Sequence, residues 1–528
     1  MTLKPLGDSA WLVEFPGEAP LGRVLGLVEA LGKNRPAGVL DVVSSFASLA
    51  VYFDTGDEME IREWIEAAAE ISDSPEIREG KEFEIPVCYG RENGMDLDEV
   101  AARTGLSPEE VITLHSGTVY TVAAVGFSPG FPYLSGLPEQ LHLPRRETPR
   151  LSVPAGSVAM AGGQAGIYPF NSPGGWHVIG RTGITLFDPD KPQPALLQPG
   201  DRVRFVPVEN LEFTGKRISE ITEPTSRWIE VIQPGALTTV QDLGRPGYGT
   251  SGVSPGGTVD RNSLRTANLL AGNDEDAAAL ELCVSGPVLK FHADAVVAFM
   301  DGAGKPQRVK AGEVVDFSKL THGVRAYLAV AGGLRIPKQL GSASTDSLAG
   351  FGGFSGRPLR AGDRLEFGEA GKTPHSGSWH VGRTSRVSEI ELRFITGVQQ
   401  DWFSPQALRR FRAEIYQITP RSDRMGARLS GEKLELATPR EMVSQPVVCG
   451  SVQVPPDGQP IILLAGCQTI GGYPQIGHVI SVDLPKLARA WPGTRVRFRE
   501  ITWEQARNLR RQEEQDFTWL RTGLELLK

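Results

Sequence analysis

The sequence has few cysteines and lacks long apolar segments. Its four cysteines, Cys88, Cys283, Cys449 and Cys467, are widely separated and none has CxxC spacing. This excludes a disulfide framework and a zinc ribbon, and it favours a reducing cytoplasm. The first residues lack the apolar core of a signal peptide, and no apolar run approaches the length of a membrane span. We therefore expect a cytoplasmic protein without membrane contact.

Basic clusters and metal-ligand patterns are also missing. The chain carries 55 Lys and Arg against 63 Asp and Glu, a formal charge of -8, and no basic block stands out. This argues against a nucleic-acid surface. None of the eight histidines forms a pair with carboxylates at ligand spacing, so no metal site is predicted. The expected partners are small molecules and proteins, and self-association stays open.

Glycine and proline are abundant. The 61 Gly and 39 Pro follow no short period, which is typical of many turns between short strands. A chain of 528 residues is long enough for three or four domains, each with its own core. We therefore expect a mainly β protein with α+β accessory parts.

One cluster of residues occurs twice, about three hundred residues apart. The first copy contains Gly156-Ser157-Val158, Ala161-Gly162-Gly163-Gln164, Tyr168-Pro169 and, at its end, Gly174-Gly175-Trp176-His177. The second contains Gly450-Ser451-Val452, Ala465-Gly466-Cys467-Gln468, Gly471-Gly472-Tyr473-Pro474 and, at its end, Gly477-His478. In the second copy Pro455-Pro456-Asp457-Gly458 supplies a turn, which indicates a longer hairpin. The repetition predicts two related β modules that share one function.

The pattern along the chain predicts four domains, at residues 1–80, 81–215, 228–385 and 388–528. The first is expected to be a small α/β domain, with strands near 11–15 and 48–53 and helices near 21–31 and 59–71. Two short helices follow at 96–104 and 107–116, the second with a capped start at Ser107. Four segments, 197–205, 309–317, 359–367 and 491–498, share a tight turn followed by a strand that ends in Phe. A helix is expected over 503–527.

Three motifs have competing interpretations. Both Gly126-Phe127-Ser128-Pro129-Gly130 and Gly252-Val253-Ser254-Pro255-Gly256 match the GxSxG elbow of serine hydrolases. That elbow needs the backbone N–H of the residue after serine, and proline has none, so both are interpreted as turns. The glycine-rich segment 350–356 is either an anion-binding nest or a loop without a ligand. His177, between Trp176 and Arg181, is open to a structural or a functional role.

Long motifs resemble a known pair of protein families. Residues 126–205, with GFSPGFPYLSGLP, PRLSVPAGSVAMAGGQAGIYP and SPGGWHVIGRT, resemble the family of the 5-oxoprolinase B subunit, the kinase inhibitor KipI and allophanate hydrolase subunit 1. Residues 231–498, with PGALTTVQDLGRPGYG, AGGLRIPKQLGSAST, SDRMGARLSG and QTIGGYPQIGHVI, resemble the partner family of the 5-oxoprolinase C subunit, the KipI antagonist and allophanate hydrolase subunit 2. The chain looks like a fusion of the B and C subunits.

The resemblance implies a fold and a reaction. It implies three cyclophilin-like β-barrels, one in the N-terminal half and two in the C-terminal half. It implies that the chain, with a separate 5-oxoprolinase A subunit, opens 5-oxoproline or a related lactam to glutamate at the expense of ATP, with Mg. One alternative is the carboxyltransferase component of a biotin-dependent urea or amide carboxylase. The other is a KipI-type regulator of a histidine kinase, although an inhibitor tethered to its antagonist is difficult to release.

Site residues follow from the same resemblance. Opening an amide requires donors for a developing oxyanion and a charged clamp. The predicted catalytic residues are His177, Asp242 and Arg245, and the predicted substrate-binding residues are Gln164, Arg181, Asn268, Gln468 and Tyr473. For Asp242 to Arg245 a local turn held by its own side chains is an equal alternative, and Tyr473 has the alternative of a core aromatic.

The sequence departs from the partner family at three positions. The acidic residue expected two positions before the Gln of QTTGGYP is Gly466, the second Thr is Ile470, and the arginine of GSRST is Ala343. Loss of a carboxylate and an arginine from a ligand pocket is expected to change the substrate or abolish catalysis.

Overall fold

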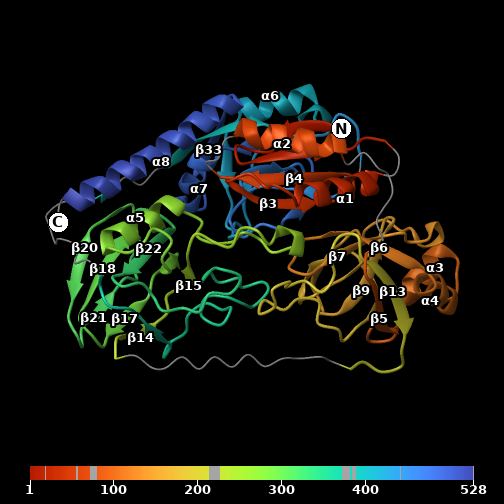
Figure 1. The fold of residues 1–528 in the computed structure, drawn as a ribbon, viewed down its shortest axis with the longest axis horizontal. Helices are drawn as coiled ribbons and strands as arrows, with labels where there is room; N and C mark the ends of the chain where they lie inside the picture. Colours follow the sequence, from red (N-terminus) through yellow and green to blue (C-terminus); the bar gives the residue numbers. More distant parts are fainter. Residues whose placement is uncertain are drawn as a thin grey trace.

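The computed structural model describes residues 1–17, 20–54, 58–71, 80–212, 226–371, 381–382, 388–440 and 442–526. It is mainly β, as expected, and its four parts are in contact (Figure 1). The N-terminal α/β part lies beside the C-terminal barrel, while the other barrel and the central β module lie below them at opposite ends (Figure 1).

The N-terminal part is a four-stranded antiparallel sheet carrying two helices. The strand order is β1-β2-β4-β3. The elements are β1 (Thr2–Pro5), β2 (Ala10–Glu14), α1 (Pro20–Leu31), β3 (Val39–Ser44), β4 (Ser48–Phe53) and α2 (Glu58–Ile71). Apolar residues of both helices, such as Leu27 and Ile61, pack with Trp11 and Val51 of the sheet. The α/β prediction for this part of the chain is confirmed.

The next part is a closed barrel of seven strands flanked by two helices. The barrel order is β10-β7-β6-β13-β5-β12-β9. The elements are β5 (Glu82–Tyr89), α3 (Leu97–Thr104), α4 (Pro108–Ser116), β6 (Val119–Val125), β7 (Pro132–Ser135), β8 (Arg150–Val153), β9 (Ser157–Ala161), β10 (Gln164–Ile167), β11 (Ser172–Gly174), β12 (His177–Arg181) and β13 (Arg202–Pro207). Ser107 and Glu110 form a capping box at the start of α4, which confirms the predicted helix start.

The C-terminal part is a second closed barrel, with strand order β25-β32-β29-β30-β27-β26-β33. Its elements are β25 (Glu389–Thr396), α6 (Pro405–Ala413), β26 (Tyr416–Ile418), β27 (Gly426–Ser430), β28 (Gln445–Pro446), β29 (Ser451–Gln453), β30 (Ile461–Leu463), β31 (Ile470–Gly471), β32 (Gln475–Val479), α7 (Leu484–Arg489), β33 (Arg495–Glu500) and α8 (Trp503–Leu526). Read in chain order, both barrels connect their seven strands around the barrel in the same sequence, and each closes with a parallel pair, β5 with β13 and β25 with β33. The predicted duplication is confirmed.

The strand register corrects the alignment of the two copies. Gly180 lies opposite Val158, and Gly477 lies opposite Val452, so Gly174–His177 corresponds to Gly471–Pro474. Ile167 also lies opposite Val158 and Ile462 opposite Val452, which pairs Gln164 with Gln459. The match of Gln164 to Gln468 was therefore wrong: Gln164 starts β10, whereas Gln468 lies in a loop after β30.

The central module differs from the closed barrel expected there. It consists of a four-stranded sheet, β21-β17-β14-β23, and a five-stranded sheet, β15-β16-β22-β18-β20. The elements are β14 (Trp228–Gln233), β15 (Leu237–Gln241), α5 (Arg261–Ala271), β16 (Ala279–Cys283), β17 (Val288–Phe291), β18 (Ala295–Met300), β19 (Ala303–Gly304), β20 (Pro306–Val309), β21 (Val314–Asp316), β22 (Arg325–Val330), β23 (Arg364–Glu366) and β24 (Val381–Gly382).

Two corners explain why this module does not close. The chain leaves β14 for β15 through Pro234-Gly235, and it leaves β16 for β17 through Val284 to Pro287. Val284 has φ 68° and Gly235 has φ 74°, both outside the strand region. Proline also lacks the N–H that would continue the strand ladder. At each corner the chain therefore leaves one sheet and enters the other.

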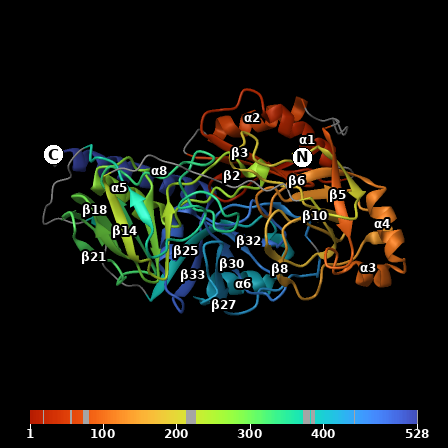
Figure 2. The same cartoon turned by 90° about the horizontal axis from the view of Figure 1, so that it is seen from below.

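Helix α8 joins the parts. It runs from the C-terminal barrel across to the central module (Figure 1). Near its start Arg507 Nη2 donates to Glu58 Oε2 at 3.0 Å, and further along Glu514 accepts from Arg265 at 2.7 Å. Seen from below, the C-terminal barrel lies between the central module and the first barrel (Figure 2). None of the helices in the described part of the chain is long and apolar enough to span a membrane.

Candidate functional site at the junction of the modules

The two GxSxG segments lie against each other at the junction of the first barrel and the central module. Gly130 N donates to Ser251 O at 2.9 Å, and a Cβ on Gly252 would lie 2.6 Å from Ser128 O. Phe127 has φ 66°, and the N–H of Ser128 donates to the carbonyl of Gly126 at 2.7 Å. This is a tight, strained turn. The interpretation of the segment 126–130 as a turn is confirmed.

A loop of the second barrel, residues 465–472, completes the junction. Ser254 Oγ donates to Ala465 O at 3.1 Å. Ile470 packs its side chain against the first barrel, in a cluster with Phe131 and Trp176 that is separate from the barrel core. A Cβ on Gly126 would lie 2.5 Å from Ile470 Cδ1, so only glycine permits this approach. Loops of three modules thus meet in one place.

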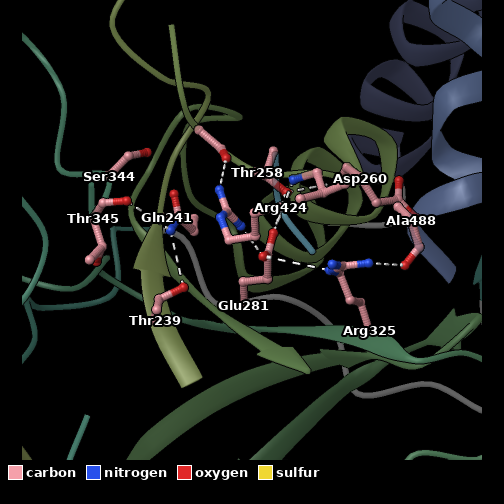
Figure 3. Close-up of polar contacts among 12 residues, drawn as sticks. Thr239, Gln241, Thr258, Asp260, Glu281, Arg325, Ser344, Thr345, Arg424 and Ala488 are labelled. Atoms are coloured by element: carbon pink, nitrogen blue, oxygen red, sulfur yellow. Dashed lines mark hydrogen bonds and ion pairs between the residues drawn. The ribbon is translucent and has the colours of Figure 1, made fainter. Parts of the chain in front are cut away.

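A buried ion pair links the central module to the second barrel (Figure 3). Arg424 donates to the Glu281 carboxylate and to the carbonyl of Gly257. Glu281 Oε2 also accepts from Tyr327 Oη at 2.8 Å and from Val259 N at 3.0 Å. Glu281 is 3 % exposed, so these bonds replace the hydrogen bonds to water that the carboxylate loses on burial.

The two carboxyl groups of this region respond differently to burial. Burial by itself would raise the pKa of Glu281, but Arg424 and Arg325, with the hydrogen bonds to the carboxylate, lower that pKa overall. Burial raises the pKa of Asp260, and Arg489, whose Nε lies 3.4 Å from Asp260 Oδ2, only partly opposes it. Asp260 caps helix α5 by accepting from the N–H of Ser263 at 2.9 Å.

Asp242 lies at the end of β15 and organises the facing loop. Its Oδ1 accepts from Gly244 N at 2.8 Å and from the hydroxyls of Ser342 and Ser344, each at 2.6 Å. Its Oδ2 accepts from Ala343 N at 2.6 Å. Four bonds therefore occupy the carboxylate. A role as a base would require it to exchange one of them.

Arg245 lies beside Asp242, beneath the glycine-rich loop 350–356. Its guanidinium stacks on Phe351 at 4.7 Å, and Nη2 donates to the carbonyl of Ser344. The side chain is 2 % exposed, and its Nε and Nη1 have no hydrogen-bond partner among the described residues. Burial lowers the pKa of Arg245, while Asp346 and Asp242 raise it. Two buried N–H donors without acceptors are suited to a carboxylate or an amide oxygen.

His177 lies in the first barrel, at the start of β12. Its Nε2 is 3.0 Å from the carbonyl oxygen of Pro144, and its Nδ1 is 4.0 Å from Glu99 Oε1. The ring is fully buried, and Nδ1 has no hydrogen-bond partner among the described residues. Arg181 ends the same strand and donates from Nε to Ala155 O at 2.8 Å. Gln164 starts β10 opposite Ala161 and Ser135.

The remaining predicted residues belong to the C-terminal half. Asn268 is buried in α5, where its Nδ2 donates to Ala277 O at 2.7 Å and its Oδ1 accepts from Asn273 at 3.2 Å. Gln468 is partly buried in the junction loop, and Tyr473 is 37 % exposed two residues after β31. The structure thus brings Asp242 and Arg245 together in the central module and places His177 in the first barrel.

Sequence reasoning missed the pair Glu281 and Arg424. One signal was a lone acidic residue in an otherwise apolar strand, since Leu280 and Leu282 on either side are fully buried. Arg424 lies in the SDRMGARLSG motif. Within the described ranges, no three His, Cys, Asp or Glu side chains are grouped so as to hold a metal ion.

The three departures from the partner family have structural counterparts. Gly466 N donates to Arg424 O at 2.8 Å, and a Cβ there would lie 3.1 Å from that oxygen. Ala343 is 1 % exposed and packs in the core of the central module. Ile470 fills a contact with the first barrel. In this chain the carboxylate that pairs with Arg424 is that of Glu281.

Two domain descriptions match the chain. The carboxyltransferase domain, subdomains C and D, matches residues 1–197, and subdomains A and B of that domain match residues 251–500. The 5-oxoprolinase C subunit of Escherichia coli (strain K12) is 37 % identical over 305 residues, which are 55 % of this chain and 97 % of that protein. The 5-oxoprolinase B subunit of Haemophilus influenzae is 43 % identical over 218 residues, 40 % of this chain and 100 % of that protein. The chain belongs to the families of the 5-oxoprolinase B and C subunits, joined in one polypeptide.

Solved structures extend the likeness of this B–C fusion. The crystal structure of TTHA0988 is 36 % identical, with a TM-score of 0.81, and covers 94 % of this chain and 100 % of its own. The Kluyveromyces lactis urea carboxylase is 28 % identical, with a TM-score of 0.51, and the match covers 55 % of the fusion but 29 % of that enzyme. The likeness to TTHA0988 therefore takes in both halves of the fusion at once.

Proposed function

We propose that this chain is the combined B and C component of an ATP-dependent 5-oxoprolinase. With a separate A subunit it opens 5-oxoproline, or a closely related lactam, to glutamate. One observation carries the proposal: the two halves match subunits of the same named enzyme over 97 % and 100 % of those subunits. The contacts between the halves add support, because the loops of both barrels and the central module meet at one junction.

The junction offers suitable chemistry for an amide. Opening a lactam places negative charge on the carbonyl oxygen, and buried N–H donors stabilise that charge. Arg245 has two such donors, and Asp242 fixes the neighbouring segment 342–344 by three hydrogen bonds. Arg245 is therefore suited to the oxyanion that develops as the ring opens, and Asp242 positions the segment beside it.

The glycine-rich loop does not fit the phosphates of ATP. Gly352 N donates to Gln339 Oε1 at 2.7 Å, Gly350 N to Asp346 O at 2.9 Å and Gly356 N to Gly352 O at 2.7 Å. These three N–H groups already have acceptors within the protein, so they do not form an open nest for an anion. We assign ATP, with Mg, to the separate A subunit or to its contact with this chain.

The direct test is reconstitution. The purified chain is mixed with the A subunit, ATP and 5-oxoproline, and glutamate and ADP are measured. We expect turnover that requires all components and that falls about 10²-fold or more in Arg245→Ala, in line with the loss of an oxyanion donor. His177→Ala is expected to reduce turnover as well, whereas Arg428→Ala, at an exposed position, keeps it. Absence of glutamate from the complete mixture refutes the proposal. Unchanged rates in both site variants refute only the residue roles.

A carboxyltransferase function is the second candidate, favoured by the match to the Kluyveromyces lactis urea carboxylase. The urea amidolyase of Saccharomyces cerevisiae is 32 % identical over 54 % of this chain, but this is 17 % of that protein. Biotin would have to be carried by another polypeptide. Carboxylation of urea on mixing the chain with a biotin carboxylase and a biotin carrier, and no glutamate with the A subunit, would favour this candidate. The remaining alternative, a regulator of a histidine kinase, predicts that the chain inhibits autophosphorylation of such a kinase.

A further inference from the structure

Four buried glutamines lie together on the second barrel. They are Gln399, Gln445, Gln453 and Gln475, between 0 and 6 % exposed, and we call them the glutamine cluster. Val452 belongs to the barrel core, so Gln453, next to it on β29, points to the outer face. Gln475 lies opposite Gln453 on β32. Gln399 joins the set, since its Nε2 donates to Gln445 Oε1 at 3.0 Å and its Oε1 accepts from Gln475 N at 3.1 Å.

Several amide groups of the cluster lack partners. The Nε2 atoms of Gln445, Gln453 and Gln475, and Oε1 of Gln475, are buried and form no hydrogen bond with the described residues. Buried amides are nearly always paired, because each unpaired group has lost its water without compensation. Three donors and one acceptor in one place therefore indicate a ligand that supplies the complementary groups.

The cluster lies under a short, thin cover. The backbone of Gly471 and Gly472 passes over it, and a Cβ on Gly471 would overlap Gln453 Nε2. The cover is held by the pairing of β31 with β28 over two residues each, in which Gln445 of the cluster itself lies opposite Gly471. The ladder itself is short, but opening the cover also requires Ile470 to leave its contact with the first barrel. Removing it would expose the amides at the surface where Tyr473 is 37 % exposed.

Arg145 of the first barrel stands at the edge of this cover. It is exposed, and its Nη2 would lie 3.4 Å from a Cβ on Gly472. The edge therefore combines a cation from one barrel with the amides of the other. This is the arrangement that a small molecule with both a carboxylate and an amide requires.

We propose that the glutamine cluster is the binding site for the lactam, with Arg145 holding its carboxylate. A lactam presents N–H and C=O on the same side of its ring, and a primary carboxamide offers the matching acceptor and donor. Gln475, with both ends free, forms this pair of bonds, and Gln453 adds a donor. The assignment rests on the proposed function for the identity of the ligand, while the location follows from the unpaired amides.

Binding to the chain alone tests the site without catalysis. Isothermal titration with 5-oxoproline is compared with two partial ligands. L-Proline keeps the ring and the carboxylate but lacks the lactam carbonyl, and 2-pyrrolidinone keeps the lactam but lacks the carboxylate. We expect saturable binding of 5-oxoproline, at least tenfold weaker binding of 2-pyrrolidinone, and none of L-proline. Equal affinity for L-proline, or no binding of 5-oxoproline either by the chain or by its complex with the A subunit, overturns the proposal.

Variants locate the site. Gln475→Met and Gln453→Met keep the side-chain length without the amide, and each is expected to lower 5-oxoproline affinity at least tenfold. Gln459→Met is the matched control, because Gln459 occupies the same barrel with its amide bonded to Gly431 at 2.9 and 3.2 Å. Arg145→Gln should weaken 5-oxoproline but leave 2-pyrrolidinone unchanged. Thermal midpoints verify that each variant is folded.

The outcomes separate the site from the function. Wild-type affinity for 5-oxoproline in both folded cluster variants overturns the site, even if the reconstituted mixture forms glutamate. Loss of binding in those variants supports the site, even if that mixture forms no glutamate and the proposed function fails. In an active mixture we expect the cluster variants to raise KM for 5-oxoproline, and an unchanged KM counts against the site.

Discussion

The ion pair of Arg424 and Glu281 allows a quantitative test of how the C-terminal barrel is joined to the central module. Arg424→Met removes the nearest cation from Glu281, a carboxylate that is 3 % exposed, and leaves Arg325, whose Nε lies 4.0 Å from Glu281 Oε1. Removal of one partner from a buried pair costs about 3–5 kcal/mol. At roughly 3 °C per kcal/mol for a unit of this size, the thermal midpoint falls by about 10 °C. The control is Arg428→Met, at an exposed position four residues later, which is expected to change stability by less than about 0.5 kcal/mol.

The same variant also tests how the stability difference from the wild type changes with pH. The pKa of Glu281 in the folded wild type is lowered from the usual value of 4.5. The ionised carboxylate therefore stabilises the folded state above pH 4.5, and this stabilisation is lost as the pH falls through the folded pKa. In Arg424→Met the folded pKa of Glu281 rises relative to that of the wild type, because the largest opposing charge is lost while Arg325 remains. The difference between variant and wild type should shrink below about pH 4.5. A variant as stable as Arg428→Met at neutral pH, or a difference that grows on acidification, would refute this reasoning.

Three further changes test other contacts. Asp483→Asn removes a fully buried carboxylate that binds Arg393 at 2.6 and 2.9 Å. Burial raises the pKa of Asp483, but Arg393 and Lys486 together lower it overall, so we expect a loss of about 1–3 kcal/mol at pH 7 in urea unfolding that disappears as the pH falls below the usual Asp range. Arg507→Met should make the N-terminal domain susceptible to limited proteolysis. Arg511, a partner of the same Glu58, is 56 % exposed, so Arg511→Met should not have this effect. Equal cleavage of the two variants would count against a role for burial. Ile470→Ala is expected to cost about 2–5 kcal/mol by calorimetry, and a loss as small as that of a surface substitution would show that the barrels are not held together there.

Local signals predicted the elements of this chain well. Alternating and helical apolar spacing placed α1, α2, β4 and α8 within a few residues of their bounds, since one side of each element must be buried. The turn-then-strand signature correctly marked β13 and β33, which close the two barrels. The same signature at β21 and β23 did not distinguish a barrel strand from a sheet edge. That choice depends on the corners at Gly235 and Val284, which a local pattern does not resolve.

The sites were less accessible to sequence reasoning. Asp242 and Arg245 are three positions apart, and their proximity needed no tertiary information. The glutamine cluster, by contrast, draws on four segments between residues 399 and 475. Glutamine is common on surfaces, so nothing in its local pattern indicates that it is buried and unpaired. The alignment of Gln164 with Gln468 was wrong because short glycine-rich motifs recur in unrelated loops, and only strand register identified the equivalent positions.

The sequence by itself determined the mainly β composition, the duplication and the membership of two families, because these are written in turn residues, apolar periods and long motifs. Only the tertiary structure decided which loops of the barrels and the central module meet, which charges are paired, and which amides are buried without partners. Contacts between residues hundreds of positions apart depend on how whole modules pack, and that packing is not encoded in any short segment.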